Sequence, residues 1–161
     1  MGAGKSTVGR HLARLLGKDF VDCDSEIEAR TGATISLIFE VEGEEGFRKR
    51  ERAMLEELTE RVNVVLATGG GAVLDPDNRA RLRTHGFVVY LCATVDLLVQ
   101  RTARDRNRPL LHEGGDRRER LEELLNERDP LYRQVADMVV VTDRRSPRHM
   151  ARDITKRIEG L

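Results

Sequence analysis

Short apolar segments alternate along this sequence with longer segments of helical period. The apolar segments lie at residues 19–24, 63–71, 87–93 and 137–142, and most of them are nearly continuous in Val and Leu. Strands without polar alternation are buried on both faces, as in a parallel sheet that helices cover on each side. The sequence therefore predicts an α/β fold, with a three-layer arrangement around a parallel sheet and four visible strands.

The segments between these strands predict helices, several with identifiable ends. In residues 5–16 apolar side chains recur every three or four positions, and Gly17 ends the pattern. Another helix is expected to start at Pro76 and to end at Gly86, and Ser146 is placed to cap the last helix. Further helices are expected at residues 24–31, 34–61 with an interruption near 43–46, 94–106, 121–130 and 147–158.

Composition excludes several classes of protein. The chain has 161 residues, enough for one domain, and its 28 basic residues balance 28 acidic ones, so no overall field favours nucleic acid or a membrane surface. No apolar run reaches the roughly 18 residues of a membrane span, and no basic stretch precedes an apolar one at the start. Cys23 and Cys92 lack metal-ligand spacing and are typical of a reduced, intracellular protein. We therefore expect a cytoplasmic protein with no nucleic-acid or membrane partner.

The first seven residues, MGAGKST, match the right-hand end of the phosphate-binding motif G-x-x-x-x-G-K-[ST]. Backbone N–H groups at the start of a helix bind anions, and Gly2 and Gly4 allow the close approach of a phosphate. Lys5 is then placed to reach the β- and γ-phosphates of a nucleotide, and Ser6 to bind Mg²⁺. The alternative is a glycine-rich segment that only precedes an amphipathic helix. The G-K-S-T run at the first helical turn favours phosphate binding.

Two acidic residues, Asp22 and Asp24, close the first visible strand. Side chains at i and i+2 of an extended segment point the same way, and strand ends line the ligand crevice of a parallel sheet. These carboxylates are therefore candidates to hold a hydrated metal and to accept a hydroxyl proton. In the alternative interpretation Asp24 caps the next helix and Asp22 is a solvated loop residue.

A charged helical segment and a triple glycine supply further candidates. Glu51 lies one turn after Arg48, so it is placed to hold the guanidinium of Arg48 for bidentate binding of a carboxylate. Gly69, Gly70 and Gly71 end a strand, where close backbone approach to a ligand is one interpretation and a plain loop the other. By its sequence alone, the Arg48 segment also fits a solvated helix face.

Three further arginines stand in loop-like contexts. Arg108 precedes a proline in a polar loop, where an arginine that closes over phosphates neutralises the charge of phosphoryl transfer. Arg133 follows an expected helix break, and Arg145 precedes the expected cap of the last helix. Taken singly, each also fits an ordinary surface charge.

Together these motifs resemble the shikimate kinase family, over residues 1 to about 158. In chain order they are Gly4-Lys5-Ser6, Asp22-Cys23-Asp24, Phe47-Arg48, Gly69-Gly70-Gly71, Arg108-Pro109-Leu110-Leu111 and Pro130-Leu131-Tyr132-Arg133. The resemblance implies a P-loop NTPase fold and one domain over residues 1–161, with a lid at about 107–119 and a substrate-binding helical region at about 33–61. It implies ATP-dependent phosphorylation of the 3-hydroxyl of shikimate, in aromatic amino acid (chorismate) biosynthesis, by a monomer.

The resemblance also implies residue roles on the nucleotide side. The residues that would bind ATP are Gly2, Ala3, Gly4, Lys5, Ser6, Thr7, Arg108 and Arg145, with Arg145 near the adenine. Ser6 and Asp22 would hold Mg²⁺, the expected metal cofactor. Lys5 and Arg108 would supply positive charge around the transferred phosphoryl group.

On the acceptor side, the resemblance implies that Asp24 binds the substrate hydroxyls and is the candidate base. Arg48 and Arg133 would bind the shikimate carboxylate, and Glu51 would brace Arg48. The backbone N–H groups of Gly70 and Gly71 would bind substrate. The catalytic set implied in this way is Lys5, Asp24 and Arg108.

The family pattern places one strand and one glycine before the position of Met1, which would make five strands. We expect that strand to be encoded upstream of Met1, and we expect the 161-residue form to be poorly stable or weakly active without it. Two alternatives stay open at this point. One is another small-molecule kinase of the same architecture, such as a gluconate or nucleotide kinase. The other is a truncated, non-catalytic nucleotide-binding module.

Overall fold

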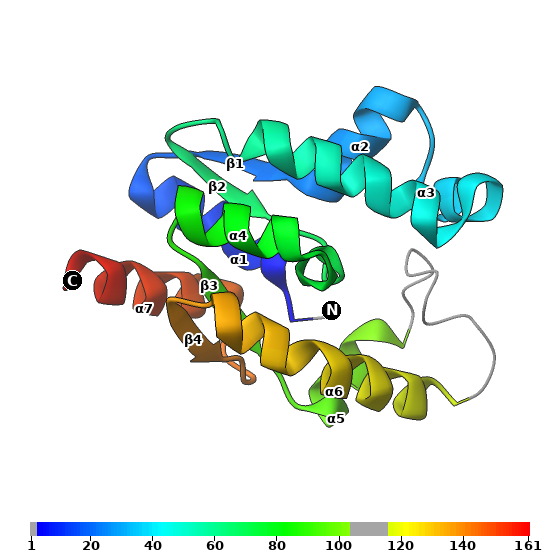
Figure 1. The fold of residues 1–161 in the computed structure, drawn as a ribbon. Helices are drawn as coiled ribbons and strands as arrows, with labels where there is room; N and C mark the ends of the chain where they lie inside the picture. The colour runs from blue at the N-terminus through cyan, green and yellow to red at the C-terminus, as the bar shows by residue number, and fades with distance from the viewer. Residues whose placement is uncertain (1–2, 104–115) are drawn as a thin grey trace.

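Four parallel strands in two pairs form the centre of the molecule, in a computed structural model that describes residues 3–103 and 116–161 (Figure 1). Strand β1 (Asp19–Asp22) pairs with β2 (Val64–Ala67), with Asp19 opposite Val64. Strand β3 (Val89–Cys92) pairs with β4 (Met138–Val141), with Val89 opposite Met138. The four predicted strands are thus present, and their pairing is parallel within each pair.

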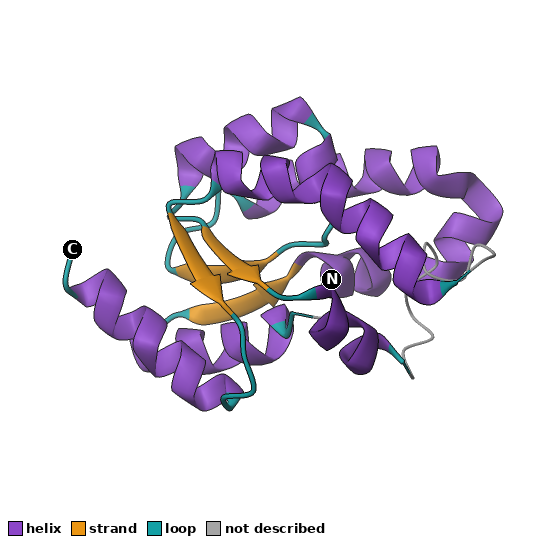
Figure 2. Cartoon of the chain, turned by 90° about the horizontal axis from the view of Figure 1, so that it is seen from below, coloured by secondary structure: helices purple, strands orange, loops and turns teal. Residues whose placement is uncertain are grey.

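Helices lie on both sides of these strands (Figure 2). In chain order they are α1 (Lys5–Leu16), α2 (Cys23–Thr31), α3 (Ile35–Leu58), the short 3₁₀ helix η1 (Ala72–Leu74), α4 (Pro76–His85), α5 (Val95–Thr102), α6 (Arg117–Val135) and α7 (Pro147–Glu159). The arrangement confirms the predicted α/β class.

Local sequence signals account for most helix ends. Side-chain oxygens that accept a hydrogen bond from the first helical turn belong to Asp22, Thr34, Asp75, Thr94, Asp116 and Ser146. Helix α1 begins after Gly4 and ends at Gly17, both in the left-handed conformation that glycine adopts without strain. The predicted interruption of α3 is present at Gly43, whose φ is 73°.

Helix α6 differs from the prediction, because it runs through Pro130 to Val135 and does not end there. A proline removes one backbone donor, which an otherwise well-packed helix tolerates at a cost. The buried residues of α6, among them Leu121, Leu124 and Val135, hold both halves of the helix against the protein. Arg133 therefore lies in the last helical turn, not after a break.

One apolar cluster connects the two strand pairs through α1. Val8 and Leu12 of α1 pack with Met138 of β4 and Ile154 of α7, and Val65 of β2 lies against the same cluster. Helix α1 also contacts β1 and β2 directly. The segment that carries the phosphate-binding motif thus packs against both two-stranded sheets.

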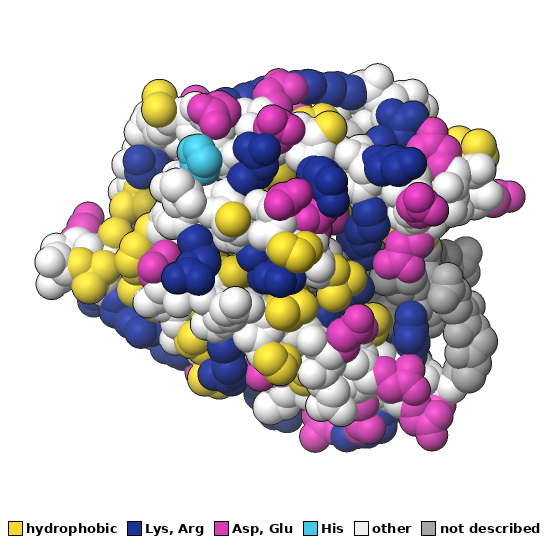
Figure 3. Space-filling view, viewed as in Figure 1, with side chains coloured by type: hydrophobic (Ala, Val, Ile, Leu, Met, Phe, Trp, Pro, Cys, Tyr) yellow, Lys and Arg dark blue, Asp and Glu magenta, His cyan; other side chains and the backbone are white. Residues whose placement is uncertain are grey.

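Charges of both signs cover the surface. On the face drawn in Figure 3, Lys and Arg side chains are interspersed with Asp and Glu. Neighbours pair across elements, as Arg52 does with Asp75 and Arg81 with Glu56. Exposed pairs of this kind contribute little to stability. Among the described helices, none has the length and apolar character needed to cross a membrane.

We predict that Leu55→Ala destabilises the protein strongly. Leu55 is fully buried in α3, at the centre of the cluster formed with α2 and β1. Removing a buried leucine costs about 2–5 kcal/mol, because transfer energy is lost and a cavity remains. Urea unfolding would measure this change. Leu37→Ala is the matched control in the same helix, since Leu37 is 45% exposed, and it should cost less than about 1 kcal/mol. Equal losses in the two variants would contradict the described core.

Candidate active site

The phosphate-binding motif forms a turn into the start of α1. Gly4 has a φ of 86°, a conformation that strains other residues, and its carbonyl accepts the N–H of Val8 at 2.9 Å. The N–H groups at a helix start point outward, where the helix dipole favours an anion. Lys5 lies in the same turn and acts electrostatically on Asp24. This geometry is suited to binding phosphate groups.

Ser6 and Asp22 form an oxygen pair beside this turn. The Ser6 hydroxyl donates to Oδ2 of Asp22 at 2.6 Å, and Oδ1 of Asp22 accepts the N–H of Ser25 at 3.1 Å. Strand β1 ends at Asp22, which caps α2, whereas the alternative interpretation of the sequence gave the cap to Asp24. Mg²⁺ prefers a few protein oxygens together with phosphate oxygens, so this hydroxyl–carboxylate pair fits such an ion.

Asp24 lies in the first turn of α2, not in the extended segment that the sequence predicted. Burial raises the pKa of Asp24, and the charge of Asp22 raises it further, while Lys5 and Arg48 oppose the rise. The buried oxygen Oδ1 of Asp24 has no hydrogen-bond partner among the described residues. An unpartnered buried acceptor is costly unless a ligand satisfies it.

Glu51 is a second buried carboxylate beside Asp24. It is 1% exposed, and its Oε1 accepts a hydrogen bond from Nη1 of Arg48 at 2.9 Å, as the spacing predicted. Burial raises the pKa of Glu51, with the charge of Arg48 acting in the opposite direction. Oε2 of Glu51 also lacks a described partner. A β-carbon at Gly69 would lie 3.0 Å from this atom and 3.2 Å from Oδ1 of Asp24, so both unpartnered atoms meet at Gly69.

The triple glycine allows close packing of backbone against these charged groups. A β-carbon at Gly71 would lie 2.2 Å from Nη2 of Arg48, which leaves no space for any other residue in this arrangement. The carbonyl of Gly70 accepts a hydrogen bond from the Tyr132 hydroxyl. Of the two interpretations of this segment, the geometry favours close approach over a plain loop.

The structure does not bring Arg133 to Arg48. Arg133 is about half exposed, bonds to Asp129 at 2.9 Å and lies against Cys92 and the ring of Tyr90. The prediction that Arg133 faces the site is therefore corrected, and the physical reason is that α6 continues past Pro130 and turns Arg133 outward.

Another arginine of α6, Arg128, lies close to Glu51. It is 3% exposed, acts on both Glu51 and Tyr132, and has a buried Nε without a described partner. Sequence reasoning missed it. The available signal was its spacing, because Arg128 shares the buried stripe of α6 with Leu121, Leu124 and Val135.

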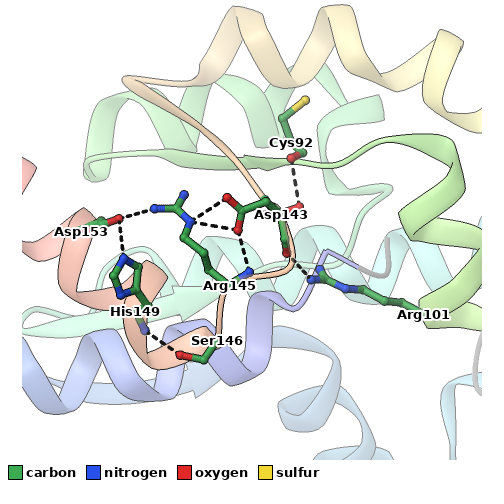
Figure 4. Close-up of polar contacts among 8 residues, drawn as sticks. Cys92, Arg101, Asp143, Arg145, Ser146, His149 and Asp153 are labelled. Atoms are coloured by element: carbon green, nitrogen blue, oxygen red, sulfur yellow. Dashed lines mark hydrogen bonds and ion pairs between the residues drawn. The ribbon is translucent and has the colours of Figure 1, made fainter.

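Arg145 lies in the loop between β4 and α7 (Figure 4). Its Nε donates to Oδ2 of Asp143 at 2.7 Å and its Nη1 to Oδ2 of Asp153 at 2.5 Å. The Asp143 carbonyl accepts from Nη2 of Arg101 at 3.2 Å, and Nη1 of Arg101 would lie 3.8 Å from a β-carbon at Gly4. Arg101, which the sequence analysis did not single out, thus connects Arg145 to the phosphate-binding turn.

The remaining predicted residues have simpler positions. Gly2 and Arg108 lie outside the described residues, as does most of the predicted lid. The Ala3 side chain is buried with Ala93 and Leu98, so only its backbone can face a ligand. Thr7 is exposed near the start of α1.

The arrangement is suited to one class of chemistry. A phosphate-binding turn, an oxygen pair for a divalent cation and the carboxylates of Asp24 and Glu51 lie together, with the half-buried Arg48 and the buried Arg128 acting on Glu51. These are the components of phosphoryl transfer from a nucleotide to a hydroxyl group of an anionic acceptor.

Comparisons with known proteins agree with this assignment. The family model described as shikimate kinase matches residues 1–159. Shikimate kinase of Pasteurella multocida is 55% identical over 161 residues, which is 100% of this chain and 92% of the relative. Shikimate kinase of Chromohalobacter salexigens is 58% identical over 161 residues, covering 100% of this chain and 89% of the relative.

Solved structures give the same result. Shikimate kinase from Acinetobacter baumannii in complex with shikimate matches with a TM-score of 0.97 and 54% identity, over 99% of this chain and 89% of that one. Shikimate kinase from Aquifex aeolicus matches with a TM-score of 0.85 and 34% identity, over 99% of this chain and 92% of that one.

We predict that Gly71→Ala displaces Arg48. The added methyl group overlaps the guanidinium, so the bond from Arg48 to the buried Glu51 is weakened. The unfolding free energy should fall by about 1–3 kcal/mol, because a buried carboxylate loses its partner. Gly86→Ala is the matched control, with an extended backbone and nothing within 4 Å of the added atom. Urea unfolding measures the free energy of unfolding of both variants. Equal stability of Gly71→Ala and Gly86→Ala would contradict the described packing.

Proposed function

The chain belongs to the shikimate kinase family, and its activity is ATP-dependent phosphorylation of shikimate. From this premise we propose how the described residues carry out the transfer of the phosphoryl group. The observation that carries the proposal is the charged group formed by the buried Glu51 and Arg128 with the partly buried Asp24 and Arg48, beside the phosphate-binding turn. It supplies acceptors for hydroxyl groups and donors for a carboxylate at the position where an acceptor substrate must lie.

We propose that Arg48 and Arg128 bind the substrate carboxylate. Both guanidinium groups act on Glu51, and Nη1 of Arg48 donates to its Oε1, so both lie close to the same carboxylate. Each has a buried Nε without a described partner, which a bound anion would satisfy. Fixed guanidinium groups bind carboxylates through two parallel hydrogen bonds. The N–H groups of Gly70 and Gly71 complete this side of the site in the proposal.

The hydroxyl groups of the substrate are assigned to the two carboxylates. Oδ1 of Asp24 and Oε2 of Glu51 meet at Gly69 and have no described partner, so both are available to accept hydrogen bonds. A substrate that lacks these hydroxyls leaves both atoms unsatisfied, which strongly disfavours its binding.

Asp24 is proposed to orient the attacking hydroxyl and to accept its proton. It is the carboxylate on which Lys5 of the phosphate-binding turn acts, so it lies toward the nucleotide. Its raised pKa favours proton uptake compared with an ordinary aspartate. Lys5 neutralises charge on the transferred group in this proposal. The same role for Arg108 stays a prediction from the sequence.

Ser6 and Asp22 are proposed to hold the magnesium ion that accompanies ATP. Their oxygens are 2.6 Å apart and lie beside the phosphate-binding turn. When bound, the ion would neutralise phosphate charge and fix the geometry of the phosphate chain. The part of this chain is to present a hydroxyl and a carboxylate on two elements, α1 and the end of β1.

The remaining assignments carry over from the resemblance of the sequence to the family. Arg145, connected through Asp143 to Arg101, is proposed to lie near the adenine. Residues 33–61 are proposed as the acceptor-binding region and about 107–119 as the lid. We also propose that the chain acts as a monomer, as the resemblance to the family implies, and that it works in the cytoplasm, where ATP is available.

A coupled ADP-release assay with ATP and Mg²⁺ tests the function. We expect turnover that depends on shikimate and is absent with gluconate or a nucleoside monophosphate, since neither offers a ring carboxylate and ring hydroxyls in the same arrangement. Turnover with one of those acceptors would favour another small-molecule kinase. ATP binding without turnover on any acceptor would favour a non-catalytic nucleotide-binding module.

We predict that Arg128→Ala weakens shikimate binding far more than Arg133→Ala. Arg128 is buried beside Glu51, whereas Arg133 is paired with Asp129 on the surface. Loss of a charge-assisted contact of about 1.5–3 kcal/mol should raise KM for shikimate about 10- to 100-fold, with KM for ATP little changed. Steady-state kinetics in both substrates decide. A larger increase in KM for shikimate from Arg133→Ala would indicate that Arg133 binds the carboxylate, as predicted from the sequence.

We predict an acidic limb in the pH profile of kcat/KM for shikimate that lies above pH 3.8. The pKa of Asp24 is raised from 3.8, and the base must be deprotonated, so activity falls as pH falls through the raised value. Asp24→Asn should remove turnover at all pH values. Glu51→Gln should turn over more slowly but keep the limb, because Asp24 remains. Loss of the acidic limb in Glu51→Gln would show that the limb reports the titration of Glu51. Circular dichroism at each pH controls for unfolding.

A further inference from the structure

Tyr132 connects α6 to the triple-glycine segment. Its hydroxyl donates to the carbonyl oxygen of Gly70 at 2.5 Å, across 62 positions of sequence. Gly70 precedes Gly71, where an added β-carbon would overlap the guanidinium of Arg48. The hydroxyl of Tyr132 therefore bonds to the peptide that determines how closely the glycine segment approaches Arg48.

The same hydroxyl lies beside the second arginine of the site. Burial raises the pKa of Tyr132, and Arg128 opposes that rise by its charge and by hydrogen bonding to the hydroxyl. The charges of Arg48 and Glu51 also act on Tyr132. One oxygen atom thus contacts Gly70 and Arg128, which belong to different segments of the proposed carboxylate site.

The ring of Tyr132 is held by a second tyrosine. The rings of Tyr90 and Tyr132 lie 4.8 Å apart between centroids, a distance typical of favourable aromatic pairs. The Tyr90 hydroxyl donates to Oδ1 of Asp129 at 2.7 Å, and Asp129 also pairs with Arg133. Arg133 therefore serves this outer network, which fixes the last turns of α6 against β3.

We propose that Tyr132 is a positioning residue for the acceptor substrate. Its hydroxyl holds the Gly70–Gly71 peptide and the Arg128 guanidinium in one arrangement, so that both are in place before the carboxylate binds. This inference rests on the proposed function, because it concerns the same acceptor site. The hydroxyl has no described contact with α1, so the nucleotide side should not depend on it.

The test compares Tyr132→Phe with Tyr90→Phe, two identical changes in one stacked pair of rings. Each removes one hydroxyl: Tyr132→Phe removes the bond to the Gly70 carbonyl, and Tyr90→Phe removes the bond to Asp129. We expect Tyr132→Phe to raise KM for shikimate about fivefold or more, with KM for ATP within twofold of the wild type. Tyr90→Phe should leave both KM values within twofold, and thermal unfolding of both variants measures any purely structural loss.

Several outcomes would overturn the inference. Unchanged KM for shikimate in Tyr132→Phe, with an active wild type, removes the positioning role. Equal increases in both variants, or equal increases in KM for both substrates, would indicate a general structural effect. Absence of shikimate turnover in the wild type would instead refute the proposed function. This outcome is measured on the wild type alone, so it is distinct from a failure of the inference about Tyr132.

A second measurement does not require loss of the hydroxyl. Difluorotyrosine at position 132 keeps the ring and oxygen but lowers the hydroxyl pKa, so the donor is lost as pH rises. We expect KM for shikimate to rise with pH in that protein, over a range where the wild type and the same replacement at position 90 stay flat. A flat profile at position 132, over a pH range in which the absorbance of the ring shows that this hydroxyl ionises, would overturn the inference even if Tyr132→Phe did not fold.

Discussion

The site depends on two buried carboxylates that face each other across a glycine. Burying one ionised carboxylate is costly, and a second one nearby increases the cost, as the raised pKa values of Asp24 and Glu51 indicate. The arrangement persists because Arg48 bonds to Glu51 and lowers the pKa of both groups. Removing one member of such a group leaves an uncompensated charge. The register of α2, α3 and the glycine segment is therefore set by this balance of charges as well as by apolar packing.

The incomplete satisfaction of these charges is itself informative. One oxygen on each carboxylate and one nitrogen on each of Arg48 and Arg128 have no described partner, although all four atoms are buried. A folded protein rarely leaves such groups without hydrogen bonds unless a ligand supplies them. Acceptors on one side and donors on the other match a substrate with hydroxyl groups and a carboxylate. The cost of the unoccupied arrangement thus also disfavours ligands that lack either group.

The sequence could predict much of this fold, and its errors share a physical cause. Apolar runs, glycine stops and side-chain caps are local signals, so the strands, most helix ends and the interruption at Gly43 were predictable. The pair of Arg48 and Glu51 also followed from helical spacing. The failures came where packing overrides a local rule: α6 continues through Pro130, so the arginine that faces the site is Arg128 and not Arg133. For the same reason Asp22 caps α2 and Asp24 enters it, because where a strand ends within D-x-D depends on tertiary contacts.

The two halves of the proposed reaction meet through few polar contacts. The nucleotide half is carried by α1, which the apolar cluster around Val8 and Leu12 fixes between the strand pairs. The acceptor half is carried by α2, α3 and α6. Ser6 bonds to Asp22, and the charge of Lys5 acts on Asp24, so each of the first two residues of α1 faces one acid of D-x-D. Because phosphoryl transfer requires positioning more than covalent chemistry, small relative shifts of these halves should affect the rate strongly. The spacing of two residues between the acids therefore matters, because it places Asp22 against Ser6 and Asp24 in the first turn of α2, where the charge of Lys5 acts on it.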